Sequence, residues 1–189
     1  MGNPLRERRS AAEWAAGPQV IEIACKVSDF EQLSTIVEAD LAALDAAKIP
    51  AGWRDTVVKG HLSFGFADAQ QLLPTVKCRA HVDVDAVCQR CLEAFRLPLQ
   101  AEADLLLLRL EQDVDGYDDY EVWELNEKLL RPLDLVEELL IMALPFSAMH
   151  VDSVSCAALA SAEDESAEDM TTPFAALRAQ MAQDNEGSG

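Results

Sequence analysis

Two long stretches of alternating apolar and polar residues flank a pair of cysteines, and this arrangement most constrains the fold. The first stretch covers residues 75–87 and the second covers residues 94–108. Successive side chains of a strand point to opposite faces, so a period of two predicts a β-strand with one buried face. The short connection between the stretches predicts an antiparallel pair. The Cys-x-x-Cys motif, Cys88 to Cys91, is therefore expected at a strand-to-strand turn.

The same periodicities predict further strands and two helices. The strands cover residues 19–27, 53–66 and 120–125. The helices cover residues 29–46 and 133–143. Asp29 is the predicted N-cap of the first helix, with Gln32 placed for a capping box. We therefore predict an α+β fold: a mainly antiparallel, strongly curved or partly closed β-sheet with two main covering helices and a disordered acidic C-terminal tail.

Length and composition predict one folded domain with tails. The chain has 189 residues, of which 50% are hydrophobic. We predict a flexible N-terminus over 1–18, a single α+β domain over 19–157, and an acidic linker with a short amphipathic segment over 158–189. The first twenty residues lack the apolar region of a signal peptide, and no apolar run is long enough to span a membrane. Five irregularly spaced cysteines do not indicate a disulfide scaffold, so we expect a cytoplasmic protein.

Negative charge is concentrated in the C-terminal half. The formal net charge is −19; residues 1–100 hold 13 acidic and 11 basic residues, whereas residues 101–189 hold 21 and 4. Such a surface repels nucleic acid and attracts a basic partner. The alternative is that the acidic surface serves solubility alone. The candidate partner-binding residues are Asp118, Asp119, Glu121 and Glu124, with Phe174 and Leu177 in the C-terminal segment.

The cysteine pair suggests half of a zinc site. Zinc prefers four sulfur or nitrogen ligands in a tetrahedron, and His150 and Cys156 are the best remaining candidates to complete it. The alternative is that Cys88 and Cys91 are ordinary buried thiols or turn residues, in which case no cofactor is expected. A redox role is less favoured, because thioredoxin-type pairs lie at a helix N-terminus and this pair precedes a predicted strand.

Basic residues around the cysteine pair form the one candidate RNA-binding patch. They are Lys77, Arg79, Arg90 and Arg96. The alternative is a solvated strand edge that lysine and arginine protect from pairing. The sequence contains no nucleophile elbow, P-loop or dinucleotide-binding motif, so nothing in it argues for catalysis.

Three blocks in order resemble the YceD family, bacterial and plastid proteins named for the accumulation of large-subunit ribosomal RNA. Residues 82–105 are similar to the family's central Cys-x-Arg-Cys-Leu block. Residues 120–150 are similar to its acidic block, with Leu133-Asp134-Leu135, Val136-Glu137-Glu138 and Leu144-Pro145 in place. Residues 173–177, Pro-Phe-Ala-Ala-Leu, resemble a C-terminal motif of one branch, with Thr172 in place of an asparagine.

The resemblance implies a non-enzymatic role in 23S rRNA accumulation and large ribosomal subunit biogenesis. Together with the charge distribution, it leads us to expect a basic ribosomal protein or a pre-50S particle as the partner. An RNA-binding module that contacts 23S rRNA through the cysteine region is a second hypothesis, and a thiol redox enzyme is a third. Relatives often carry a second cysteine cluster after the Leu-Pro pair, which this chain lacks.

Overall fold

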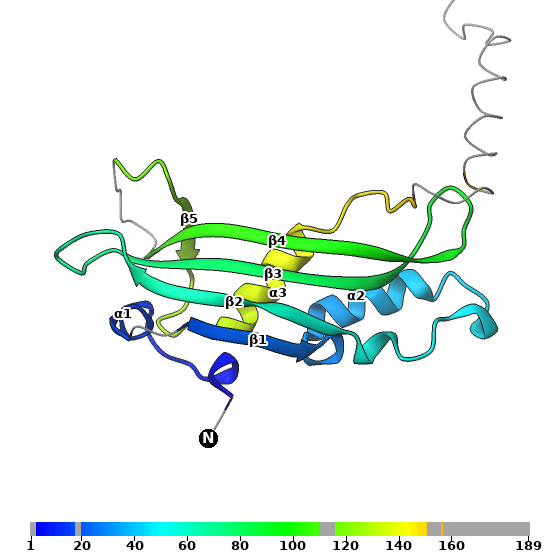
Figure 1. The fold of residues 1–189 in the computed structure, drawn as a ribbon, viewed down its shortest axis with the longest axis horizontal. Helices are drawn as coiled ribbons and strands as arrows, with labels where there is room; N and C mark the ends of the chain where they lie inside the picture. The colour runs from blue at the N-terminus through cyan, green and yellow to red at the C-terminus, as the bar shows by residue number, and fades with distance from the viewer. Residues whose placement is uncertain (1–2, 18–19, 110–115, 151–155, 157–189) are drawn as a thin grey trace, which may run out of the picture. The chain divides into compact units, whose positions relative to one another are not determined.

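The computed structural model describes residues 3–17, 20–109, 116–150 and Cys156. Residues Met1–Met149 form one compact unit built around a five-stranded sheet in the order β1-β2-β3-β4-β5 (Figure 1). The strands are β1 (Val20–Lys26), β2 (Val57–Phe66), β3 (Pro74–Val87), β4 (Ala94–Arg109) and β5 (Glu121–Leu125). All neighbours pair antiparallel except β4 and β5, which pair parallel. The predicted α+β fold and the mainly antiparallel sheet are confirmed, but the sheet stays open, so partial closure was wrong.

Strand register follows from the apolar alternation read from the sequence. Strand β1 alternates exposed and buried residues throughout its length, and the inward residues of β2 and β3 are buried in the same way. The longest pairing runs from Thr75 opposite Leu106 to Val87 opposite Ala94, and it ends at the cysteine turn. A shift of one residue would move every inward side chain to solvent, so the buried face fixes this register.

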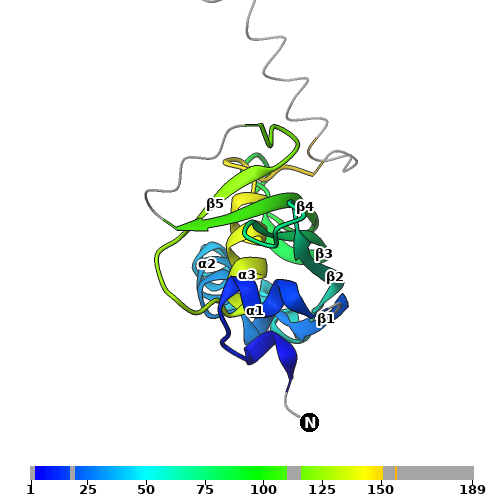
Figure 2. The same cartoon turned by 90° about the vertical axis from the view of Figure 1, so that its left-hand side faces the viewer.

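Helices α2 (Glu31–Leu41) and α3 (Pro132–Met142) lie against the same face of the sheet (Figures 1 and 2). Leu33, Val37 and Leu41 recur at helical spacing and form the buried stripe of α2. Helix α3 begins with Pro132 at its first position, where the missing N–H costs nothing. Between them, the two helices and the inner face of the sheet form the hydrophobic core.

The predicted helix start at Asp29 was wrong. Residues Val27–Asp29 form the 3₁₀ turn η2, and Asp29 accepts a hydrogen bond from Lys26 N at 2.9 Å instead of capping α2. The cap comes from a distant element: Glu137 of α3 accepts hydrogen bonds from the backbone N–H groups of Gln32 at 2.6 Å and Leu33 at 3.0 Å. A local capping pattern could not reveal an acceptor more than a hundred residues away in the chain.

The N-terminal segment, which the sequence predicted to be flexible over residues 1–18, contains two short helical elements. Residues Pro4–Arg6 form the 3₁₀ turn η1 and Ala11–Ala16 form α1, which Ser10 and Glu13 close with a reciprocal capping box. Trp14 is buried, stacks on Phe64 of β2 with ring centroids 5.5 Å apart, and donates its indole N–H to Leu130 O. A six-residue helix has too little periodicity to be read from sequence, and packing of its tryptophan stabilises it.

Two further 3₁₀ turns form part of the connection between α2 and β2. The turns η3 (Ala46–Lys48) and η4 (Trp53–Asp55) lie between α2 and β2, so the predicted strand over 53–66 begins later than expected. The limits predicted for the folded domain stay a prediction. The predicted acidic linker and amphipathic segment over 158–189, with Phe174 and Leu177, lie outside the described residues.

Candidate metal centre

The turn between β3 and β4 positions the cysteine pair. Cys88 N donates to Glu93 O at 2.9 Å, and Leu92 N donates back to Cys88 O at 2.9 Å. Leu92 adopts a left-handed backbone with φ of 56°, which closes the turn. Cys88 is buried and Cys91 half-buried, so bulk water has limited access to the pair. The prediction that the two cysteines lie together at a turn is confirmed.

The segment that follows α3 returns to this turn. Gln89 N, between the two cysteines, donates a hydrogen bond of 2.9 Å to Ala148 O. This contact fixes the backbone two residues before His150 against the Cys-x-x-Cys turn. The sequence offered no indication of it, because backbone pairing between single residues leaves no pattern in side-chain identity.

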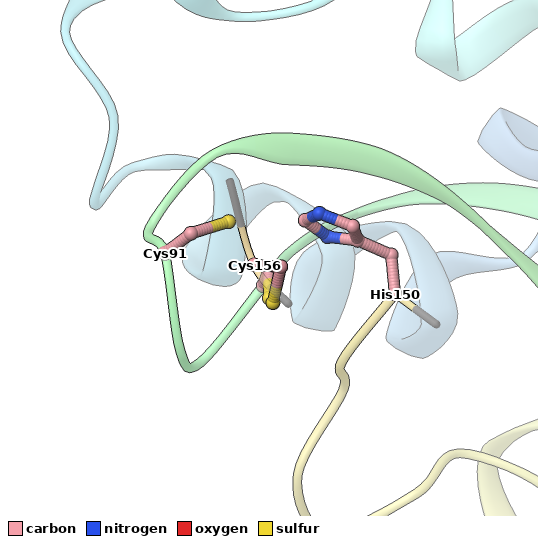
Figure 3. Close-up of side chains that lie close together, drawn as sticks. Cys91, His150 and Cys156 are labelled. Atoms are coloured by element: carbon pink, nitrogen blue, oxygen red, sulfur yellow. The ribbon is translucent and has the colours of Figure 1, made fainter. Parts of the chain in front are cut away.

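Cys88, Cys91, His150 and Cys156 offer one ligand atom each, and these atoms all lie within 4.8 Å of one another. Figure 3 shows Cys91 and His150 extending toward each other, with Cys156 beside them. In a tetrahedral zinc site with bonds of about 2.3 Å to sulfur, ligand atoms are about 3.8 Å apart. The cluster therefore needs only a small contraction to surround an ion. The sequence-based choice of His150 and Cys156 as partners of the pair is thus supported by geometry.

The donor set fits zinc in a structural role. Three thiolates and one imidazole match the Cys₃His sets of closed structural zinc sites, in which four protein ligands leave no position for water. Soft sulfur donors select against magnesium and calcium, which prefer oxygen. A closed tetrahedral site would join the turn to the segment after α3 without supplying a catalytic water.

The other two cysteines belong to the core. Cys25 lies on the inward side of β1 and Cys78 on the inward side of β3, and both are buried. Burial raises the pKa of the Cys25 thiol, and it raises the pKa of the Cys78 thiol to about 11. A thiol with such a pKa is protonated at neutral pH and is a poor nucleophile. Neither residue is a candidate for redox chemistry.

Three of the candidate RNA-binding residues lie on one face of the sheet, but acidic neighbours pair with them. Lys77, Arg79 and Arg96 lie at alternate positions of the paired strands, on the face opposite the helices. Lys77 pairs with Asp104 at 3.1 Å, Arg79 pairs with Glu102 and Asp104, and Arg96 pairs with Asp85 at 3.2 Å. The fourth residue, Arg90, lies within the cysteine turn. Neighbouring carboxylates thus neutralise much of the patch that the sequence suggested.

The candidate acidic residues gather at the opposite end of the same strand pair. Asp118 and Asp119 lie in the turn before β5, and Glu121 and Glu124 lie on β5 itself; all four are exposed. Strand β5 pairs with Leu105–Arg109, whereas the cysteine turn precedes Ala94. At about 3.3 Å per residue, these two sites are about 35 Å apart along β4. The acidic residues and the metal cluster are therefore separate surfaces.

These features define an α+β protein with an open, mostly antiparallel sheet and a candidate structural metal centre at one end. The profile of a known family, described as "Large ribosomal RNA subunit accumulation protein YceD", matches residues 76–179. The chain belongs to the YceD family, as the sequence resemblance predicted.

A protein of Haemophilus influenzae with the same name is 38% identical over 93 residues, covering 47% of this chain and 51% of the relative. The chain thus spans about half the length of this curated relative. No solved structure matches the chain. No helix in the described part of the chain has the length and apolar character that crossing a membrane requires.

Proposed function

We propose that this protein is a non-enzymatic factor that supports 23S rRNA accumulation and large ribosomal subunit biogenesis in the cytoplasm. Membership of the YceD family, whose printed name refers to large-subunit ribosomal RNA accumulation, carries the proposal. The molecule acts by binding, and its partner is a basic ribosomal protein, free or within a pre-50S particle.

The placement of acidic side chains supports a basic protein as the partner. Asp118, Asp119, Glu121 and Glu124 are exposed around an edge strand, so their charges face solvent. Ribosomal proteins bind RNA through dense clusters of lysine and arginine. An acidic surface can cover such a cluster until RNA displaces it, because opposite charges steer the encounter and salt-dependent contacts exchange readily.

Direct RNA binding is the second candidate function. The shared face of Lys77, Arg79 and Arg96 favours it, since phosphate contacts need several cations on one surface. Their pairing with Asp104, Glu102 and Asp85 weakens it, because each carboxylate repels the phosphates that its partner would attract. A protein partner is therefore the better account of this molecule.

In this proposal, zinc bound by the Cys₃His cluster has a structural role. It fastens the β3–β4 turn to the chain after α3 and leaves the acidic surface unchanged. The proposed function does not include catalysis. The two core thiols are held in their protonated form, and a closed metal site activates no water.

Cross-linking of the purified full chain to large-subunit precursor particles, read by mass spectrometry, tests the proposal. We expect cross-links from residues 117–127 to ribosomal proteins, together with reduced 23S rRNA when the gene is deleted. Cross-links that go mainly to rRNA from the strand face of Lys77 and Arg79 would favour the second candidate. Unchanged 23S rRNA in the deletion strain, with no association with the particles, would refute both.

A further inference from the structure

Strand β5 forms one edge of the sheet. Its neighbour in the strand order is β4, and Figure 2 shows β5 on the opposite side of the sheet from β1. In an edge strand, alternate residues point their backbone N–H and C=O groups away from the sheet, where a further strand can pair with them. The strand order therefore leaves one side of β5 without a neighbouring strand among the described residues.

The outward side of β5 makes no backbone hydrogen bond within the described chain. The backbone of Glu121–Leu125 bonds only in its parallel pairing with β4. Of the described helices and strands, only β4 packs extensively against β5. Val122 is 59% exposed, and Glu121 and Glu124 are exposed beside it. An exposed apolar residue on an edge with unpaired backbone groups is typical of a site where a peptide adds to the sheet.

The other edge strand, β1, is a less suitable site. The turn η1 packs against it, and the backbone N–H of Lys26 at its end already donates to Asp29 Oδ2 at 2.9 Å. Strand β1 also carries one acidic residue, Glu22, and one basic residue, Lys26, so its charges favour neither sign of partner. The two edges of the sheet thus differ in both backbone access and charge.

Charge determines which kind of strand fits β5. Residues 116–127 contain five acidic residues and no basic one, so the whole region favours a cationic partner. An added strand places its side chains about 5 Å from those directly opposite, where unlike charges stabilise the pairing and like charges oppose it. A second copy of this chain would bring two acidic edges together. A segment that carries lysine or arginine is therefore the better occupant.

The spacing of the acids sets the pattern of that segment. Glu121 and Glu124 are three residues apart, so they lie on opposite faces of the sheet. Residues that oppose them in an added strand are also three apart, one on each face. Val122 and the half-buried Trp123 lie between the acids and offer apolar surface to the stems of long cationic side chains.

We propose that β5 binds an extended basic segment of a protein partner as a sixth strand of the sheet. The inference rests on the proposed function, which supplies a basic protein as the partner, and it specifies how that partner is held. Backbone hydrogen bonds to the outward side of β5 hold the segment, and two cations three residues apart, opposite Glu121 and Glu124, fix its register. Since β5 has five residues, the paired segment is about as long.

The test uses the full-length protein labelled with nitrogen-15 and three capped peptides. The first is acetyl-Thr-Lys-Val-Val-Lys-Thr-amide, whose palindromic sequence fits β5 in either direction. The second is the same peptide N-methylated at its four central residues, which keeps the charge and removes the backbone donors. The third has glutamate in place of both lysines.

We expect the basic peptide to shift the amide signals of Glu121–Leu125 saturably. At a peptide concentration of about ten times its Kd, the outward amides of β5 should exchange with solvent about tenfold more slowly, because they exchange only from the free protein. The N-methylated and acidic peptides should each bind about tenfold more weakly, since one has lost its backbone hydrogen bonds and the other repels the edge.

Variants of the two glutamates test the register. Glu121→Gln and Glu124→Gln keep the side-chain shape, and we expect each to weaken binding of the basic peptide about threefold, as is usual for an exposed ion pair. Glu22→Gln is the matched control, because Glu22 is exposed on the other edge strand. It should leave binding unchanged.

Several outcomes would overturn the proposal. Equal binding of the N-methylated peptide would mean that charge alone attracts it, and equal binding of the acidic peptide would mean that charge has no part. Shifts centred on β1, an equal effect of Glu22→Gln, or no saturable shift with the basic peptide would also contradict it.

Failure of this inference and failure of the proposed function are distinguishable. If the basic peptide does not bind while residues 117–127 still cross-link to ribosomal proteins, strand addition is wrong and the proposed function stands. If the peptide pairs with β5 while the chain does not associate with large-subunit particles, the edge site stands and the proposed function is wrong.

Discussion

At the level of single residues, Gly60 shows the closest backbone approach of the two glycines in the described strands. A Cβ built on it would lie 2.0 Å from Arg79 O and 2.7 Å from Ala80 Cα, both backbone atoms of β3. Gly60→Ala should therefore force β2 and β3 apart and lower the free energy of unfolding by about 2–4 kcal/mol, measured by urea denaturation.

Gly65 of the same strand is the matched control for Gly60. The nearest atom to a Cβ there is Thr75 Oγ1 at 3.8 Å, an ordinary contact. Gly65→Ala should change the free energy of unfolding by less than about 1 kcal/mol, and a small gain is expected because the unfolded chain loses freedom. Equal losses in the two variants would contradict the argument from close approach.

Asp85 links stability to pH. Burial raises the pKa of its carboxyl group, and the Arg96 guanidinium lowers it only in part. The folded protein thus binds this proton more tightly than the unfolded chain, so ionisation above the raised pKa lowers the free energy of unfolding. The loss disappears as the pH falls through the raised pKa toward the ordinary value of 3.8.

Asp85→Asn should remove that loss. We expect the variant to be more stable than the parent at pH 7, by about 1 kcal/mol, and the difference to shrink on acidification toward pH 4. Asp83→Asn, an exposed residue two positions earlier, is the control and should change little. A less stable Asp85→Asn variant at pH 7 would show that the pair with Arg96 outweighs burial.

At the level of elements, Glu137 joins the two helices that cover the sheet. Its carboxylate satisfies two backbone N–H groups at the start of α2, where the helix dipole also favours a negative charge. Glu137→Ala should lower the free energy of unfolding by about 2–3 kcal/mol, since one buried and one part-buried backbone donor lose their acceptor. Glu137→Gln keeps an oxygen and should cost less.

The neighbouring residue gives the control for this cap. Glu138 lies on the same helix but is exposed. Glu138→Ala should change stability by less than about 0.5 kcal/mol in the same urea titration. Similar losses at both positions would mean that the acidic residues act through their charge on α3 and not through the cap of α2.

The cysteine turn is the second element whose role can be measured. Protein purified without chelator should contain about one zinc per chain, and Cys91→Ser should contain less than about 0.1, with a lower Tm, because a tetrahedral structural site needs all four ligands. Cys25→Ala, in the core of β1, should keep its zinc while losing some stability, because the buried Cys25 side chain is truncated. Parent protein with less than about 0.1 zinc per chain would exclude a structural zinc.

At the level of the whole molecule, charge is distributed unevenly between the halves of the sequence. A net −17 falls on residues 101–189, from 21 acidic and 4 basic residues. The described part of that excess includes the exposed side chains around β5. A basic partner would gain electrostatic steering from this surface.

Salt and charge reversal test that role. Replacing Asp118, Asp119, Glu121 and Glu124 with lysine should slow association with large-subunit particles and flatten its dependence on salt, since these contacts are screened within about 10 Å at 0.1 M. The variant should unfold at nearly the parent temperature, because all four side chains are exposed. An unchanged association rate and salt slope would show that the acidic surface is not the contact.

Local sequence patterns were sufficient to predict the strands, the main helices and the turn with Cys88 and Cys91, and to indicate the family. Period-two alternation and helical spacing are local properties, so they can be recognised in the sequence without knowledge of the tertiary structure. Ligand chemistry also limits the choice of residues, and this is why His150 and Cys156 could be named in advance as partners of the cysteine pair.

Other features could be seen only in the folded chain. They are the open sheet, the parallel β4–β5 pair, the capping of α2 by Glu137 and the ion pairs that neutralise Lys77 and Arg79. It also brought α2, the end of β3 and the segment after α3 together around one groove. Each of these features depends on groups that are distant in the chain and meet only when the core forms. Their energies come from burial and from long-range partners, and neither is encoded in the spacing of neighbouring residues.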